Sequence, residues 1–304
     1  KARDYCRNQG IDIRNAMEEG TPSLGGYTVP VEMANTIIRL VEEYGVARQY
    51  CRNYPMASNV TDIPIRADGL TVNYIGEGAS ITTSDLTFGT AQLVAKKPAM
   101  MSLLSTELSE DSVINIVDLI TTEMAWGFAN NEDNQVFNGD GNPINGIATT
   151  VHADSKVPIG TAAAITLDDL HIAVGKAPIY PGANYRWYFN SQMFNTNVAP
   201  LLDALGGTTQ RMFEEGNAMS LLGYPVTFAQ AMPANGAGMV GLFGDLSLGT
   251  VLGTRRQVTI KRFDELYGAT DQIALQSTMR HDFVVVDPGT ANNPGCLISI
   301  ESAA

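Results

Sequence analysis

One long segment of the chain constrains its fold more than any other. Between Ser112 and Phe137 apolar residues recur at spacings of three and four, which places them on one face of a helix. These residues are Val113, Ile116, Val117, Ile120, Met124 and Phe128. Asp111 or Ser112 can cap the start, and Asn138-Gly139 predicts the end. The sequence therefore predicts a helix that spans roughly 38 Å and buries one face.

Composition places the chain among folded soluble proteins. It has 304 residues, of which 44% are hydrophobic and 17% are charged, enough to bury a substantial core. Apolar runs such as Phe283–Val286 are far shorter than the roughly 20 residues that a membrane span needs. We therefore expect a protein made inside the cell, without a membrane partner.

Chemistry at a metal or a disulfide is not indicated. The three cysteines, Cys6, Cys51 and Cys296, are an odd number without metal-ligand spacing, which favours lone thiols. His152, His171 and His281 are far apart in the sequence and favour packing or surface roles. We expect no catalytic residue, no cofactor and no metal.

Two motifs match ligand-binding patterns only formally. Gly236–Gly241 reads GxGxxG, but Pro233 precedes it and a strand-like run follows, so a turn is favoured over a dinucleotide site. Asn138, Asp140 and Asn142 have calcium-loop spacing, but Pro143 stands where that loop needs Gly. A turn that ends the long helix is the favoured interpretation.

The first half contains an arm, a helix and a hairpin. Residues 1–24 are polar and predict an extended arm. In Val31–Tyr44 the apolar spacing predicts a helix that Gly45 closes. Residues 53–97, with the runs Val60–Ile65 and Leu70–Ile75, predict a long β-hairpin. Such a hairpin is marginally stable alone, so it should lie on a partner.

The second half predicts an α+β domain at about 151–250. Thr166 and Asp169 suit a helix start, Arg186–Phe189 a buried strand, and Arg211–Leu222 a helix. Beyond it, Gln257–Lys261 and Asp282–Asp287 predict strands. Helices and strands mix without strict alternation, which is typical of the α+β class.

Several motifs, taken in order, resemble one family. They are Gly25–Pro30, Ser105–Ser112, Ala129–Ile147, Tyr188–Ser191, Leu222–Val226, Ala231–Pro233 and Leu242–Asp245. In this order and spacing they resemble the major capsid proteins of tailed bacteriophages, whose shell fold is named after phage Hong Kong 97. The resemblance covers nearly the whole chain.

The resemblance implies a domain plan. It comprises an N-terminal arm at 1–24, a segment leading into a helix at 25–52, and an extended loop at 53–97 that reaches over the adjacent subunit. A peripheral domain at 98–150 and 251–304 contains the long spine helix. An axial domain at 151–250 surrounds the symmetry axes.

The resemblance also implies intersubunit contacts. In the extended loop we expect them at Ile75, Glu77 and Phe88. A further set flanks Gly268 in a polar loop that meets its copies at threefold axes, where complementary charges would fix register. That set is Arg262, Asp264, Glu265 and Asp271. A solvated loop is the open alternative for these four residues.

Covalent cross-linking is not expected. The family's type member joins a loop lysine to an asparagine with a glutamate's help, and the matching positions here hold Gly78, Asp271 and Thr278. None of the three residue types suits the reaction. The resemblance thus implies a non-enzymatic shell protein without autocatalytic cross-links.

The implied partners follow from shell assembly. They are further copies of the chain in pentamers and hexamers, a portal, a scaffold or protease, and a possible cement protein. The net charge of −13 argues against sequence-specific DNA binding but suits a lining that repels packaged double-stranded DNA. We expect assembly in the bacterial host cytoplasm and residence in the virion. Because Lys1 is not an initiator Met, we also expect a precursor with a cleaved N-terminal segment.

Three alternatives stay open at this stage. An encapsulin nanocompartment shell or a gene transfer agent capsid would share the fold. A secreted β-rich hydrolase or lectin would need a signal peptide or a clustered acid pair, and neither is visible in the sequence.

Overall fold

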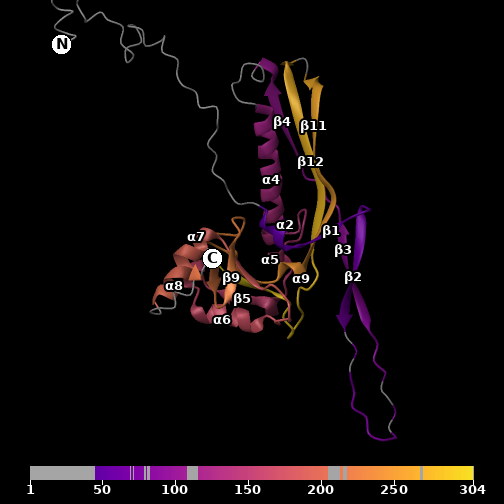
Figure 1. Ribbon diagram of the computed structural model, residues 1–304, viewed down its shortest axis with the longest axis vertical. Coiled ribbons are helices and arrows are strands. Elements are labelled where there is room, and N and C mark those ends of the chain that lie inside the picture. Colours follow the sequence, from indigo (N-terminus) through magenta and orange to yellow (C-terminus); the bar gives the residue numbers. More distant parts are fainter. Residues whose placement is uncertain are drawn as a thin grey trace, which may run out of the picture. The chain divides into compact units, whose positions relative to one another are not determined.

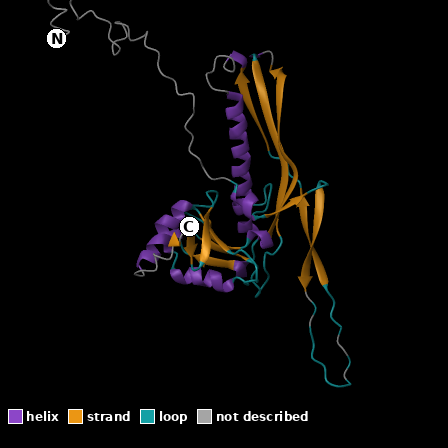
Figure 2. Ribbon diagram, in the orientation of Figure 1, coloured by secondary structure: helices purple, strands orange, loops and turns teal. Residues whose placement is uncertain are grey.

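A computed structural model describes residues 45–68, 70, 72–78, 80, 83–107, 116–204, 213–214, 218–267 and 270–303 (Figures 1 and 2). The predicted arm at 1–24, the predicted helix at 31–44 and the helix caps at Asp111 and Ser112 lie outside these residues. So does Cys6.

A four-stranded sheet carries the long helix. Its strand order is β1–β11–β12–β4, with bounds Arg52–Pro55, Thr250–Tyr267, Gln272–Val285 and Ala99–Ser105. Helix α4 spans Ile116–Asn138 and packs beside β12 (Figure 1). It ends at Asn138, and Met124 and Phe128 are buried, so the helical stripe is confirmed for the described residues.

A seven-stranded sheet forms the core of the other described half. Its order is β5–β13–β10–β6–β9–β8–β7, with bounds Lys156–Ile159, Leu297–Ser302, Gly238–Gly244, Arg186–Phe189, Tyr224–Phe228, Ala218–Leu221 and Phe213–Glu214. Trp187, Phe189 and Phe243 are fully buried within it; Trp187 stacks on Phe189 and contacts Phe243 with the two rings tilted by 43°. The predicted buried strand at Arg186–Phe189 is confirmed as β6.

Shorter helical elements complete the described chain. They are α2 (Val46–Tyr50), α5 (Ile147–Thr150), α6 (Leu167–Lys176), α7 (Ser191–Met193), α8 (Ala199–Ala204), α9 (Leu246–Gly249), the 3₁₀ turns η4 (Ala153–Ser155) and η5 (Ala162–Ala164), and the π-helical turn η6 (Phe194–Val198). The predicted start of α6 is confirmed. The Thr166 hydroxyl accepts from the Asp169 backbone N–H, and the Asp169 carboxylate accepts from the Thr166 N–H.

The hairpin prediction is confirmed in part. Strands β2 (Val60–Asp68) and β3 (Thr87–Val94) pair antiparallel, with Val60 opposite Val94. Two details are wrong. Residues 53–55 belong to β1, which pairs in parallel with β11, and the described residues of 70–75 form no strand.

Three further expectations are wrong. The helix predicted at Arg211–Leu222 gives way to β7, β8 and the turn Leu222-Gly223, which joins β8 to β9. Both turn residues have positive φ, 54° and 84°, as the tightest β-hairpin turns require. Strand β13, predicted to lie with the peripheral segment 251–304, pairs with β10 and β5 instead.

The third correction concerns the polar loop around Gly268. Arg262, Asp264 and Glu265 lie within β11, because that strand stays paired with β12 as far as Tyr267 opposite Gln272. Among the described residues of this turn, Thr270 and Asp271 are outside the strands. The predicted strands at Gln257–Lys261 and Asp282–Asp287 are parts of β11 and β12, and β12 itself ends at Val285.

The two formal ligand motifs are turns, as predicted. Gly236 and Gly238 have φ of 105° and 118°, and strand β10 follows instead of a helix. The Asp140 carboxylate accepts from the Asn142 backbone N–H, which closes the turn after α4. Among the described residues, no group of His, Cys, Asp and Glu is arranged to hold a metal ion.

Candidate functional site

A buried carboxylate fixes the base of the β2–β3 hairpin. Asp282 of β12 accepts a hydrogen bond from the Val94 N–H at the end of β3, at 2.5 Å. Burial raises the pKa of this carboxyl, while the N–H groups of Val94 and Phe283 and the charge of Lys96 oppose the rise. Two backbone hydrogen bonds join Lys96 to His281 just beyond. The hairpin is thus tied to β12 where its second strand ends.

Asn59 adds a second tie at the same base. Its side-chain oxygen accepts from Arg280 at 2.5 Å and from Arg255 at 3.3 Å, and its backbone oxygen accepts from the Ala95 N–H at 2.9 Å. This asparagine begins the formal glycosylation sequon Asn59-Val60-Thr61. Since its amide oxygen accepts from two arginines of the same chain, Asn59 has a structural role at the hairpin base.

A small apolar cluster completes the base. Its buried members are Met56, Leu93, Ala95 and Val251, drawn from the hairpin, its flanks and β11. A side chain at Gly253 would come within 2.8 Å of Leu93 and Met56, so a larger residue there would have to displace both side chains. The base therefore has its own core.

The far part of the hairpin is exposed. In Figure 1 the loop between β2 and β3 continues beyond both strands. The exposed fractions are 82% for Val72, 102% for Tyr74 and 69% for Phe88. Ile75 is 39% exposed, and Glu77 lies in a turn with Gly78, whose φ is 81°. An exposed apolar patch of this kind is typical of interaction surfaces, which makes the loop a candidate site.

The other predicted contact residues lie at the end of the β11–β12 pair. Arg262 is exposed on β11, and Asp271 is exposed in the turn with φ of 50°. Asp264 and Glu265 lie on β11, and their side chains are outside the described set. The backbone oxygen of Asp271 accepts from the Thr106 N–H at 3.2 Å. Arg262, Asp264 and Glu265 lie in the four-stranded sheet, whereas Phe88 lies in the two-stranded sheet of β2 and β3 and Ile75 lies in no strand.

An acid pair on α4 was not foreseen from the sequence. Asp133 is buried and accepts from the backbone N–H groups of Gly45, Val46 and Ala47, at 2.8, 3.1 and 2.9 Å. It thereby caps helix α2, where residues 1–44 join the described chain. Burial raises the pKa of the Asp133 carboxyl, and the three N–H donors oppose that rise.

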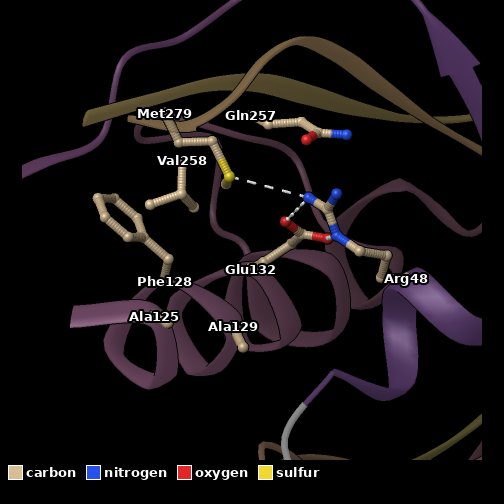
Figure 3. Close-up of a pocket in the computed structure, with 8 residues that line it drawn as sticks. All are labelled: Arg48, Ala125, Phe128, Ala129, Glu132, Gln257, Val258 and Met279. Atoms are coloured by element: carbon tan, nitrogen blue, oxygen red, sulfur yellow. Dashed lines mark hydrogen bonds and ion pairs between the residues drawn. The ribbon is translucent and has the colours of Figure 1, made fainter. Parts of the chain in front are cut away.

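Its neighbour Glu132 binds Arg48 of α2. The two side chains form a forked ion pair, with N···O distances of 3.0 and 2.5 Å. Figure 3 shows this pair on one wall of a cavity of about 380 Å³, which Phe128, Val258 and Met279 also line. The sequence did hold a signal, because Glu132 continues the buried i, i+4 positions Met124 and Phe128.

His281 is buried without a hydrogen-bond partner on either ring nitrogen. Burial, and then the positive charge of Arg48, lower its pKa to about 4. Cys51 and Cys296 are free and buried, as expected for lone thiols. Burial raises the pKa of Cys51 to about 12, so this thiol is inert.

Comparison with known proteins identifies the family. The profile of the Phage capsid family matches residues 25–291. The chain belongs to the phage capsid family. It is 23% identical over 240 residues to the major capsid protein of Klebsiella oxytoca phage phiKO2, covering 77% of this chain and 55% of that protein. It is 27% identical over 184 residues to the probable major capsid protein gp17 of Mycobacterium phage L5, covering 59% of this chain and 55% of that protein. The chain thus spans about half the length of these curated relatives.

Solved structures share the fold. The capsid of a native GTA particle, computed with C5 symmetry, matches with a TM-score of 0.75 at 19% identity, over 95% of this chain and all of that one. A chain from Mycobacterium phage Bobi matches with a TM-score of 0.75 at 18% identity, over 95% of this chain and 99% of that one. The mixed α and β class is therefore confirmed as a phage capsid fold. No described helix is long and apolar enough to cross a membrane.

The Asp133 cap yields a stability prediction. Asp133→Asn replaces a carboxylate that three N–H groups share, so the free energy of unfolding should fall by about 2–3 kcal/mol. Urea unfolding of the unassembled chain measures this change. Asp85→Asn, in an exposed loop, is the matched control and should change it by less than about 0.5 kcal/mol. Equal effects of the two substitutions would contradict the capping role.

His281 yields a pH prediction. Its folded pKa of about 4 lies below the ordinary value of 6.5, so the unfolded chain binds the proton first. Its contribution to stability is therefore complete above pH 6.5 and is lost as pH falls through 4. His281→Leu should reduce the loss of unfolding free energy between pH 6.5 and pH 4. The reduction should be up to about 1.4 kcal/mol for each unit of pKa difference.

Comparing His281→Leu with the unmodified protein isolates the contribution of this histidine to the pH dependence of stability. Asp133 and Asp282, whose pKa values burial raises, act in the opposite sense and are common to both proteins. His171→Leu, at an exposed position of α6, is the control and should leave the pH profile unchanged. An unchanged profile for His281→Leu would show that the histidine titrates normally.

Proposed function

We propose that the chain is a major capsid protein that self-assembles into an icosahedral shell around the double-stranded DNA of a tailed phage. Membership of the phage capsid family and the names of two relatives support this proposal. The observation that carries it is the apolar loop of the β2–β3 hairpin, exposed beyond a base that is tied to β12.

The domain plan of the Hong Kong 97 type is part of the proposal. The hairpin lies within the extended loop at 53–97, α4 is the spine helix of the peripheral domain at 98–150 and 251–304 apart from β13, and 151–250 forms the axial domain. Strand β13 joins the axial sheet. The arm at 1–24 and the segment at 25–52 complete the plan.

Assembly gives each exposed surface a partner. Burying Val72, Tyr74 and Phe88 against a neighbour removes apolar area from water, at roughly 25 cal/mol for each Å². One such contact is modest, but closed symmetry repeats it around every pentamer and hexamer. Arg262, Asp264, Glu265 and Asp271 supply charges at the contacts between capsomers.

The shell works without an enzymatic step. Gly78 has no side-chain amine, and residues 53–95 contain no lysine. Thr278, at the position of the type member's glutamate, is buried, and its hydroxyl accepts from Arg256 at 2.7 Å. A shell held by noncovalent contacts, with a possible cement protein, follows from these residues.

The remaining partners follow from the proposed role. They are a portal, a scaffold or protease during assembly, and DNA packaged without sequence-specific binding in the bacterial host. A gene transfer agent capsid is the second candidate, because a GTA capsid matches with a TM-score of 0.75. Sequencing the DNA inside purified particles separates the two, since a phage packages its own genome and an agent packages host DNA.

Negative-stain microscopy of the purified protein tests shell formation. Closed icosahedral particles are expected when the complete reading frame is expressed. A monodisperse monomer over a wide range of salt concentration would overturn the proposal.

A denaturing gel tests the absence of cross-links. Particles boiled in detergent with reductant should give one band near 32.6 kDa for this chain. Ladders of higher mass that survive the treatment would show covalent joining and contradict the expectation.

A further inference from the structure

Strand β4 forms an unguarded edge of the four-stranded sheet. It pairs with β12 on one side without a register shift, and no strand in the described part of the chain pairs with its other side. Proteins usually protect such edges with charges, proline or a bulge. The sequence of β4, Ala-Met-Met-Ser-Leu-Leu-Ser, has no charge and no proline. This edge can therefore accept another strand.

The side chains of β4 alternate between two faces. Met100 points to α4, where a side chain at Gly127 would lie 3.0 Å from it, and Leu104 is buried. Met101 and Leu103 point the other way and are 44% and 47% exposed. The outer face of the sheet is thus apolar at its open edge.

The hairpin loop carries a segment that suits this edge. Val72–Ile75 consists largely of residues that favour strands, yet it lies in no strand. In an extended chain Val72 and Tyr74 share one face, and they are the most exposed large apolar residues of the described chain. One chain therefore presents both an open apolar edge and an exposed apolar segment that is not assigned to a strand.

The segment does not reach its own β4. Strand β3 leads directly through residues 95–98 into β4, and the loop and β4 extend away from that junction in different directions (Figure 1). Only another copy can supply the segment.

We propose that Val72–Ile75 of one copy adds as an antiparallel strand to the β4 edge of a second copy. In the register that matches the exposed faces, Val72 lies beside Leu103 and Tyr74 beside Met101, as cross-strand pairs. Glu77 then falls next to Pro98 and the exposed Lys97, so opposite charges meet. This inference rests on the proposed function, because it names the surface that receives the loop in a shell.

A proline scan tests strand addition directly. Successive N–H groups of a strand point to opposite sides, so proline removes a bond to β4 only at alternate positions. The effects of three variants, Val72→Pro, Asn73→Pro and Tyr74→Pro, should therefore alternate along the segment. The yield of shells should fall at least tenfold either for the variant at 73 alone or for both variants at 72 and 74. Alanine at the same positions controls for loss of the side chain. Equal yields from all three proline variants would overturn strand addition.

Paired cysteines test the register. In a Cys6→Ser background, Val72→Cys with Leu103→Cys should form disulfide-linked oligomers in shells, because directly opposed residues lie within disulfide reach. Val72→Cys with Ile172→Cys, at an exposed position of α6, is the control and should not. Each single variant reports the background from Cys51 and Cys296.

The outcomes separate this inference from the proposed function. Shells that form normally but give no disulfide between 72 and 103 would overturn the strand pairing and leave the capsid role standing. Absence of shells from the unmodified chain would overturn the capsid role itself.

Discussion

The hydrogen bond from the Val94 N–H to the Asp282 carboxylate is the interaction on which the proposed function depends most. A two-stranded hairpin is marginally stable alone, and this one carries exposed apolar residues at its far end. It can hold them away from its own core because its base is fixed by Asp282, by Asn59 and by the cluster around Leu93. The anchored base thus makes the exposed loop available to another molecule.

A similar logic applies where α2 begins. Asp133 satisfies three N–H groups that a helix start would otherwise leave without partners, and Glu132 pairs with Arg48 one turn on. Burying two adjacent carboxylates is costly unless each is bound. Here each is bound, and the two together hold α2 on α4.

The sequence predicted elements whose signals are local. The end of α4 at Asn138, the capping box of Thr166 and Asp169, and the β2–β3 pairing all follow from nearby residues. The failures depend on contacts distant in sequence. Residues 211–222 have a helical pattern, but Leu221 pairs with Tyr224 and packs in the core, so the strand is favoured. Residues 70–75 have strand-forming side chains, but those of them that the structure describes form no strand.

The residues of the candidate site also fall into those with a local sequence signal and those that depend on contacts distant in sequence. Apolar residues in a β-forming loop could be picked out from residue type alone, and Ile75 and Phe88 are exposed as that choice needs, but their contacts with other copies stay a prediction. The ties at Asp282 and Asp133 could not, because a buried carboxylate is recognised only when the N–H groups that it accepts from are placed beside it. Whether Arg262, Asp264, Glu265 and Asp271 meet other copies stays a prediction.

Hydrogen exchange tests the central claim most directly, that the loop is held exposed in one chain and covered on assembly. The account predicts rapid exchange for residues 72–78 and 83–86 in free capsomers and strong protection of the same residues in shells, while the base at residues 91–95 is protected in both. Equal exchange of the loop in capsomers and shells would contradict it.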